Sequence, residues 1–166
     1  MQPEQSPRRL SSYESVVGAA EIEQIYQLAK PLRGMSVQHL SSTYRGGGVA
    51  ELLARLVPLM RDVGLFTSWD VIRAERGFFQ VTKDFHNALH GAYEEILPDD
   101  YSIYLETTRK NFDLVSQDAD FVITHDPQTV GLVEARQQAK KQYWLWRCHI
   151  DLAEADPRVW GFLRSY

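Results

Sequence analysis

Short apolar runs alternate with helix-length amphipathic segments along this chain, and this alternation limits the folds open to it. Runs typical of strands cover 35–41, 65–73, 119–124 and 142–150, and apolar residues at helical spacing cover 13–32, 49–63, 78–91, 100–114 and 128–141. Because helix-length segments separate the strands, the strands are expected to pair in parallel through right-handed crossovers. The sequence therefore predicts an α/β fold with a Rossmann-like, doubly wound and mostly parallel sheet.

The length and charge of the chain exclude several classes of protein. Its 166 residues predict one domain, over 13–166, behind a polar lead-in at 1–12. A net charge of −4 provides no basic field for nucleic acid or an anionic membrane. No apolar run approaches the roughly 20 residues that a membrane-spanning helix needs. The single cysteine, Cys148, cannot form an internal disulfide, so a cytoplasmic protein is expected.

A glycine cluster follows the first strand, at the edge where such sheets bind ligands. The three glycines Gly46–Gly48 let the backbone approach a ligand closely, and the helix behind them offers free N–H groups. The loop has neither the Walker A nor the G-x-G-x-x-G spacing. It is predicted to face a phosphate or a sugar hydroxyl, and a plain strand-to-helix turn is the alternative. Pro58 is expected to bend or split the helix that follows.

A second polar group, His125-Asp126-Pro127-Gln128, follows the third strand. Asp126 before a proline at the first helical position is typical of a helix N-cap. This interpretation leaves His125 and Gln128 to reach a ligand.

A third group lies at the end of the last strand. Strand alternation puts Arg147 and His149 on one face of a strand that is expected to be buried, where a basic pair requires an anion or a polar substrate. Asp151 flanks the pair, and Cys148 is interpreted as a small buried hydrophobic residue.

A fourth group lies on a predicted helix. His86 and His90 share a face at i, i+4, a spacing that can hold a metal ion, but Asn87 stands where an H-E-x-x-H site has glutamate. No metal site is therefore predicted, and His86 and Asn87 are expected to line a cleft.

Taken in order, five segments resemble the amino-terminal part of trehalose synthases and trehalose phosphorylases, which are family 4 retaining glycosyltransferases of GT-B fold. These segments are SST with GGGVAELL in 41–53, FFQVTK in 78–83, FHNALHG in 85–91, HDPQ in 125–128 and WRCHIDL in 146–152. The resemblance extends from about Tyr13 to the end of the chain, and its specificity comes from the order of the five segments.

The resemblance implies an enzyme that transfers glucose from a nucleoside-diphosphate glucose to glucose, with retention, to give trehalose. His149 would be the catalytic residue beside the donor sugar. The donor enters as a substrate, so no tightly bound cofactor is expected, and assistance by Mg²⁺ is left open. The residues expected to bind acceptor or donor are Gly46, Gly47, Gly48, Glu51, His86, Asn87, His125, Asp126, Gln128, Arg147 and Asp151.

The resemblance also implies that this chain holds only part of such an enzyme. The family's second Rossmann-like domain holds the nucleotide, and nothing in 13–166 corresponds to it. The chain is therefore expected to be the incomplete amino-terminal half of a GT-B enzyme and inactive alone. Its expected partners are glucose or trehalose and the missing carboxyl-terminal domain. A homo-oligomer is left open, because an incomplete sheet exposes an edge.

Three other functions compete with this interpretation. One is a trehalose phosphorylase, and another is a metal-dependent hydrolase that uses the His, Cys and Asp side chains of 125–126 and 148–151. The third is a non-catalytic carbohydrate-binding module with tryptophans stacked on sugars. The glycosyltransferase interpretation requires that 46–48, 125–128 and 147–151 converge at one rim of the sheet.

Overall fold

A computed structural model describes residues 9–136 and 141–166 of the chain. Its strands are β1 (Ser36–Ser41), β2 (Phe66–Val71), β3 (Phe121–His125) and β4 (Tyr143–Arg147). They form one sheet of order β2-β1-β3-β4, and each neighbouring pair is parallel. The predicted Rossmann-like, parallel α/β fold is confirmed.

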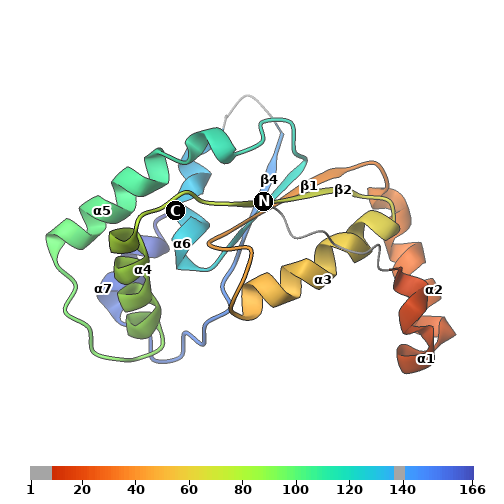
Figure 1. Cartoon of the computed structure of the whole chain (residues 1–166), viewed down its shortest axis with the longest axis horizontal. Coiled ribbons are helices and arrows are strands. Elements are labelled where there is room, and N and C mark those ends of the chain that lie inside the picture. The colour runs from red at the N-terminus through yellow and green to blue at the C-terminus, as the bar shows by residue number, and fades with distance from the viewer. Residues whose placement is uncertain (1–8, 137–140) are drawn as a thin grey trace.

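Helices cover both faces of the sheet (Figure 1). On one side lie α1 (Glu14–Val17), α2 (Ala19–Ala29) and α3 (Gly48–Asp62), and on the other lie α4 (Arg76–Leu89), α5 (Pro98–Arg109), α6 (Pro127–Val130) and α7 (Pro157–Leu163). Short 3₁₀ helices are η1 (Leu10–Tyr13), η2 (Lys30–Leu32), η3 (Phe112–Leu114) and η4 (Gly131–Ala135).

The two-residue period of the strands divides the core between the two faces. Val37 and Trp69 point to the α2–α3 side, where buried residues of α2 and α3 pack against the sheet. Leu40 and Val122 point to the other side and join the largest core cluster, which includes Phe85 of α4. Every strand but the outer ones is thus enclosed between two helical layers.

The amino-terminal helix predicted over 13–32 is interrupted. Gly18 has a φ of 93°, a left-handed conformation that ends α1 before α2 begins. Of the predicted lead-in, residues 1–8 lie outside the described residues. Leu10 is buried, and its N–H donates to Oδ2 of Asp62 at 2.8 Å, so the chain is already docked on α3 at this point. Pro58 does not split α3, which runs unbroken through it.

The helix predicted over 128–141 is much shorter, because a tyrosine interrupts its hydrogen-bond ladder. The hydroxyl of Tyr104 donates to the Pro127 carbonyl at 2.8 Å and accepts the Gly131 N–H at 3.1 Å. In a continuing α-helix those two backbone groups would bond to each other. The α-helix α6 therefore ends at Val130 and continues only as η4 to Ala135, while 137–140 lie outside the described residues.

The last strand is shorter and more exposed than predicted. β4 ends at Arg147, so His149 lies in the following loop rather than on the strand. Tyr143 and Leu145 are 48% and 47% exposed, because β4 is an outer strand of the sheet and only its other face packs against the core. The predicted burial of this strand is wrong.

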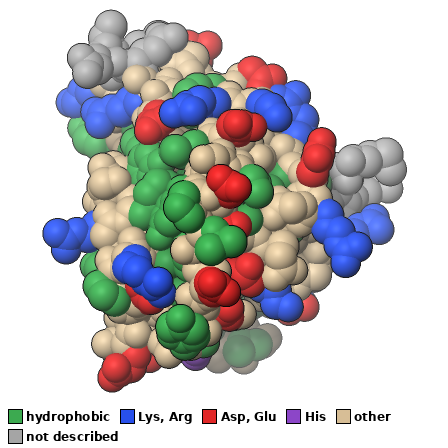
Figure 2. Space-filling model, turned by 90° about the vertical axis from the view of Figure 1, so that its left-hand side faces the viewer, with side chains coloured by type: hydrophobic (Ala, Val, Ile, Leu, Met, Phe, Trp, Pro, Cys, Tyr) green, Lys and Arg blue, Asp and Glu red, His purple; other side chains and the backbone are tan. Residues whose placement is uncertain are grey.

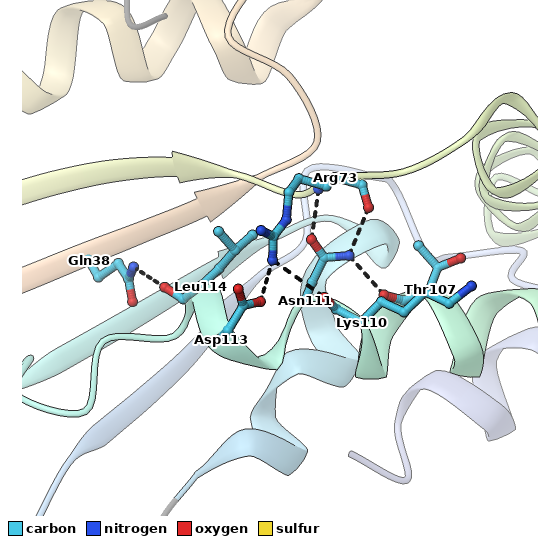
Figure 3. Close-up of polar contacts among 7 residues, drawn as sticks. All are labelled: Gln38, Arg73, Thr107, Lys110, Asn111, Asp113 and Leu114. Carbon is cyan, nitrogen blue, oxygen red and sulfur yellow. Dashed lines mark hydrogen bonds and ion pairs between the residues drawn. The ribbon is translucent and has the colours of Figure 1, made fainter.

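Hydrogen bonds of polar side chains fix the segment after β2 against the end of α5 (Figure 3). The side chain of Asn111 is buried; it accepts the Arg73 N–H at 2.7 Å and donates to the carbonyls of Arg73 and Thr107 at 2.9 and 2.8 Å. The guanidinium of Arg73 pairs with Asp113, and Gln38 of β1 donates to the Leu114 carbonyl at 2.8 Å. These bonds hold η3 beside the sheet.

On the face seen in Figure 2, that of α4, α5 and α7, hydrophobic side chains reach the surface between charged rims. The large hydrophobic residues Tyr93 and Leu97, in the connection from α4 to α5, are 87% and 51% exposed.

Within residues 9–136 and 141–166, no helix is both long and apolar enough to cross a membrane.

Candidate functional site

The sheet has a topological switch point between β1 and β3. From β1 the chain proceeds to β2 on one side, and it later returns to β3 on the other side. The strands end at one level, since Leu40 pairs with Thr124 and His125 pairs with Arg147. Ligands of open parallel sheets bind beyond such an edge, at the switch point. The predicted strand-end groups of 46–48, 125–128 and 147–151 all follow strands that end there.

The glycine loop connects β1 to α3. Gly46 and Gly47 have φ values of 76° and 86°, which glycine adopts without strain. Gly48 begins α3 with no such requirement, and no described atom lies within 4 Å of a Cβ built on any of the three. The positive φ values of the turn therefore explain why positions 46 and 47 are glycines. They do not explain Gly48, whose backbone a ligand could approach closely. Glu51 is exposed and, together with Gly48, borders a surface pocket on α3.

Asp126 ties the end of β3 to the loop after β4. Its Oδ1 accepts the N–H of His149 at 2.7 Å, and its own N–H donates to the Arg147 carbonyl at 3.1 Å. The Asp126 carbonyl also accepts the indole N–H of Trp146 at 3.1 Å. The predicted N-cap role is wrong, since the carboxylate makes no capping bond to α6 and is used across the sheet edge instead.

Three histidines, which we call the histidine array, run from the sheet interior to this edge. His149 Nε2 lies 3.0 Å from Nδ1 of His125, and His125 Nε2 lies 3.0 Å from Nδ1 of His39 in β1. The array ends at Met60 of α3, where His39 Nε2 lies 3.3 Å from the sulfur. His39 and His125 are 1% and 2% exposed, whereas His149 is exposed.

Burial keeps the inner two rings uncharged at neutral pH. Desolvation lowers the pKa of His39 to about 4. Desolvation, then the charges of His39, His149 and Arg147, lower the pKa of His125 to about 3. Sequence reasoning missed His39. The available signal was a histidine inside the buried run of 37–40, where a polar side chain needs a partner.

The other predicted site residues are not all joined to this group. Gln128 has a buried Oε1 without a hydrogen-bond partner among the described residues. Arg147 ends β4 in an exposed position, and Asp151 accepts the Ala153 N–H at 3.0 Å in a local turn. On α4, His86 is exposed and Asn87 donates to Glu94 at 2.9 Å. The described contacts do not connect His86 or Asn87 to the histidine array.

The described side chains also bear on the alternatives of a metal centre and a sugar-stacking module. Among residues 9–136 and 141–166, no group of three or more His, Cys, Asp and Glu side chains is arranged to hold a metal ion. Within the histidine array the ring nitrogens face one another, not a common point. Trp69 is 2% exposed and donates to Ser41 Oγ at 2.8 Å, so it belongs to the packed interior. Trp146 stacks on Trp160, and both are half-buried in the wall of a surface pocket.

Comparison with known proteins adds to this geometry. The family described as "Trehalose synthase, N-terminal domain" matches residues 39–166. The chain is 43% identical over 161 residues to a trehalose synthase of Pyrococcus horikoshii, and 45% identical over 161 residues to one of Thermococcus litoralis. Both alignments cover 96% of this chain but only 38% and 39% of the synthases. A trehalose phosphorylase of Pleurotus pulmonarius is 27% identical over 157 residues, covering 86% of this chain and 21% of that protein.

Proposed function

Because the chain belongs to the trehalose synthase N-terminal domain family, we propose that it is the acceptor-side half of a retaining glycosyltransferase. The proposed enzyme transfers glucose from a nucleoside-diphosphate glucose to a second glucose and so makes trehalose. The chain spans about two fifths of the length of the synthases it matches. In the proposed enzyme, the remaining three fifths supply the domain that holds the nucleotide. The donor enters as a substrate, and no tightly bound cofactor takes part.

The observation that carries the proposal is the hydrogen bond between Asp126 and His149, which joins the ends of β3 and β4 beside the switch point. It holds an exposed imidazole above the strand ends, where a bound sugar would lie. In the proposed enzyme, His149 contacts the donor glucose beside the reacting carbon. Asp126 fixes the position of His149, and the buried ring of His125 contacts it from the inner side of the array.

The remaining predicted residues are proposed to bind the two sugars. The buried Oε1 of Gln128, which has no hydrogen-bond partner among the described residues, is proposed to accept from a hydroxyl of the acceptor glucose. A buried acceptor without a partner is unfavourable until a ligand supplies one. The N–H groups around Gly46–Gly48 face the donor phosphates. Arg147 and Asp151 are proposed to lie beside the bound sugars, and Glu51, His86 and Asn87 are assigned to sugar binding on the resemblance of their motifs alone.

The proposal extends to the positive charge that the reaction requires. Transfer with a diphosphate leaving group requires cations and N–H donors aimed at the developing negative charge. At the described strand ends, the exposed cations are Arg147, which ends β4, and Arg45, which precedes the three glycines in the loop after β1. We therefore propose that the chain alone does not transfer sugar and that the second domain brings most of the positive charge.

A phosphorylase is the second candidate, since trehalose phosphorylases of Pleurotus pulmonarius and Grifola frondosa are also similar to the chain. The synthases are favoured because their identities of 38–45% exceed the 24–27% of the phosphorylases. The two reactions differ in the acceptor for glucose in the reverse direction: a phosphorylase uses inorganic phosphate.

The test joins the chain to the remaining portion of the Thermococcus litoralis trehalose synthase and measures trehalose formation from glucose with a panel of nucleoside-diphosphate glucoses, with and without Mg²⁺. We expect trehalose with at least one donor, and a loss of roughly a hundredfold or more in His149→Ala. His90→Ala is the control, because His90 is another exposed histidine, at the end of α4. Glucose 1-phosphate from trehalose and phosphate would support the phosphorylase instead. Full activity in His149→Ala of a protein that folds and binds donor would refute the proposed role.

A further inference from the structure

The direction of the hydrogen bonds in the histidine array decides which nitrogen of His149 is presented to a ligand. A neutral imidazole carries one N–H and one lone pair, and distances alone do not distinguish the two. The array has one end at His149 and the other at Met60 of α3. If the group at one end can only donate or only accept, the direction of every hydrogen bond between the two ends is fixed.

Met60 is such an end. Its thioether sulfur bears no hydrogen and can only accept, and it lies 3.3 Å from Nε2 of His39. His39 is buried and uncharged, so it has a single N–H to use. The proton of His39 is therefore on Nε2, facing the sulfur. With a proton on Nδ1 instead, the lone pair on Nε2 would face the lone pairs of the sulfur, and His39, which is 1% exposed, could not be satisfied by water.

The remaining bonds follow in sequence. Since Nδ1 of His39 has the lone pair, it accepts from Nε2 of His125 at 3.0 Å. His125 is also uncharged, so its Nδ1 has the lone pair and accepts from Nε2 of His149, again at 3.0 Å. His149 thus donates inward through Nε2. Its Nδ1, which makes no hydrogen bond to any described residue, is directed away from the array.

We propose that Met60 is a positioning residue that acts through His39 and His125 to hold His149 as the Nε2–H tautomer, with the Nδ1 lone pair turned toward the ligand. The class of ligand group that this nitrogen recognises is a hydrogen-bond donor, a hydroxyl; that the hydroxyl belongs to a sugar rests on the proposed function. Any proton that His149 gains is added at Nδ1, on the ligand side. The tautomer itself requires no substrate and no second domain.

The test is a long-range ¹H–¹⁵N correlation spectrum of the 166-residue chain labelled with ¹⁵N-histidine, recorded at pH 7.5. We expect the ring-nitrogen shifts of His39, His125 and His149 to show a protonated Nε2 and an unprotonated Nδ1. The exposed His86 and His90 serve as internal references. A protonated Nδ1 as the main form of His39 or of His125 in the parent chain would overturn the proposal, and this outcome depends on no variant.

The variant Met60→Leu removes the acceptor while keeping a similar volume. We expect the Nδ1–H form to rise from a minor to a comparable population in His39, with a shift in the same direction in His125 and His149. Met35→Leu is the matched control, since Met35 is a partly buried methionine outside the array, and it should leave all three tautomers unchanged. A folded Met60→Leu chain with the parent's tautomers would refute the role of Met60. Neither result depends on glycosyl transfer, so this experiment tests the tautomer independently of the proposed function.

Discussion

The carboxylate of Asp126 accepts the backbone N–H of His149 at 2.7 Å, although Asp126 itself holds a backbone conformation that disfavours any side chain. Its φ of 59° and ψ of −179° lie in a region that is essentially restricted to glycine. Strain of this kind costs of order 1–3 kcal/mol and persists where the surrounding structure enforces it. Here it aims the carboxylate from the end of β3 at the loop that follows β4. A glycine would fit the backbone better but would lose the tether.

The substitution Asp126→Gly removes both the backbone strain at this position and the hydrogen bond to His149, and stability and turnover report on them separately. We expect its free energy of unfolding to stay within about 1 kcal/mol of the parent, because relieved strain offsets the lost hydrogen bond to a charged group. Turnover of the joined enzyme should fall by roughly tenfold to a hundredfold as His149 loses its position. Asp126→Asn keeps an acceptor and should retain most of the turnover. Urea denaturation and initial rates measure both effects, and equal turnover in the glycine variant and the parent would contradict the positioning role.

Substitution of Gly48 tests whether a ligand lies close to this backbone, because the substitution is not expected to destabilise the chain. Gly48 is helical, and an added Cβ would meet no described atom within 4 Å, so Gly48→Ala should leave stability unchanged or raise it by up to about 1 kcal/mol. If the donor phosphates approach this backbone, turnover should fall by about tenfold or more. Gly161→Ala in α7 is the control, because Gly161 is also helical, exposed and open, and lies in a different element. Unchanged donor KM and kcat in Gly48→Ala would mean that the cluster is only a turn.

The hydroxyl of Tyr104 should be essential to the short helix after β3. Tyr104→Phe leaves the Pro127 carbonyl and the Gly131 N–H without the buried partner that joins them, so we expect a loss of about 1–3 kcal/mol in the free energy of unfolding. Tyr101→Phe is the control, because its ring packs on Phe162 while its hydroxyl makes no hydrogen bond to a described residue. Thermal unfolding of the two variants measures the difference. Equal melting temperatures would show that the interrupted ladder does not depend on this hydroxyl.

Sequence patterns predict the elements of this fold well and their interruptions poorly. The period of the apolar residues is local information, and it correctly predicts a parallel sheet with strand-end groups near His125 and Arg147. The end of α6 depends instead on Tyr104, a residue 23 positions before Pro127. The exposure of β4 depends on its place at the outside of the sheet, which no local pattern reveals.

The same distinction applies to the site. His125 and His149 could be predicted because strand ends are where such sheets bind ligands. The position of His39 within a buried run indicates only that its side chain needs a partner. That this partner is Met60 could not be predicted, since Met60 belongs to a helix whose apolar pattern is ordinary. Only the packing of α3 on β1 brings the Met60 sulfur to the His39 ring.

Burial of two uncharged histidines makes stability depend on pH in a definite direction. The pKa values of His39 and His125 in the folded chain are about 4 and about 3, below the ordinary value of about 6.5 that applies after unfolding. Below pH 6.5 the unfolded chain therefore binds protons that the folded chain does not. The stability that the neutral rings provide is complete above pH 6.5 and decreases as the pH falls toward 4. The charged groups that face His125 are His149 and Arg147, whose positive charges act in the same direction.

We expect the free energy of unfolding to fall between pH 7 and pH 5 with a slope of up to about 2.7 kcal/mol per pH unit, the limit for two protons. This window lies above the range in which carboxylates titrate, so their protonation contributes little. His39→Gln removes one of the two rings while keeping a side chain that can donate and accept, and it should reduce the slope by about half. His90→Gln, at an exposed position, should keep the parent's slope. Urea denaturation at pH 7, 6 and 5 measures all three chains. A slope in His39→Gln equal to that of the parent would mean that His39 binds as many protons in the folded chain as in the unfolded chain, and the neutral array would then have to be abandoned.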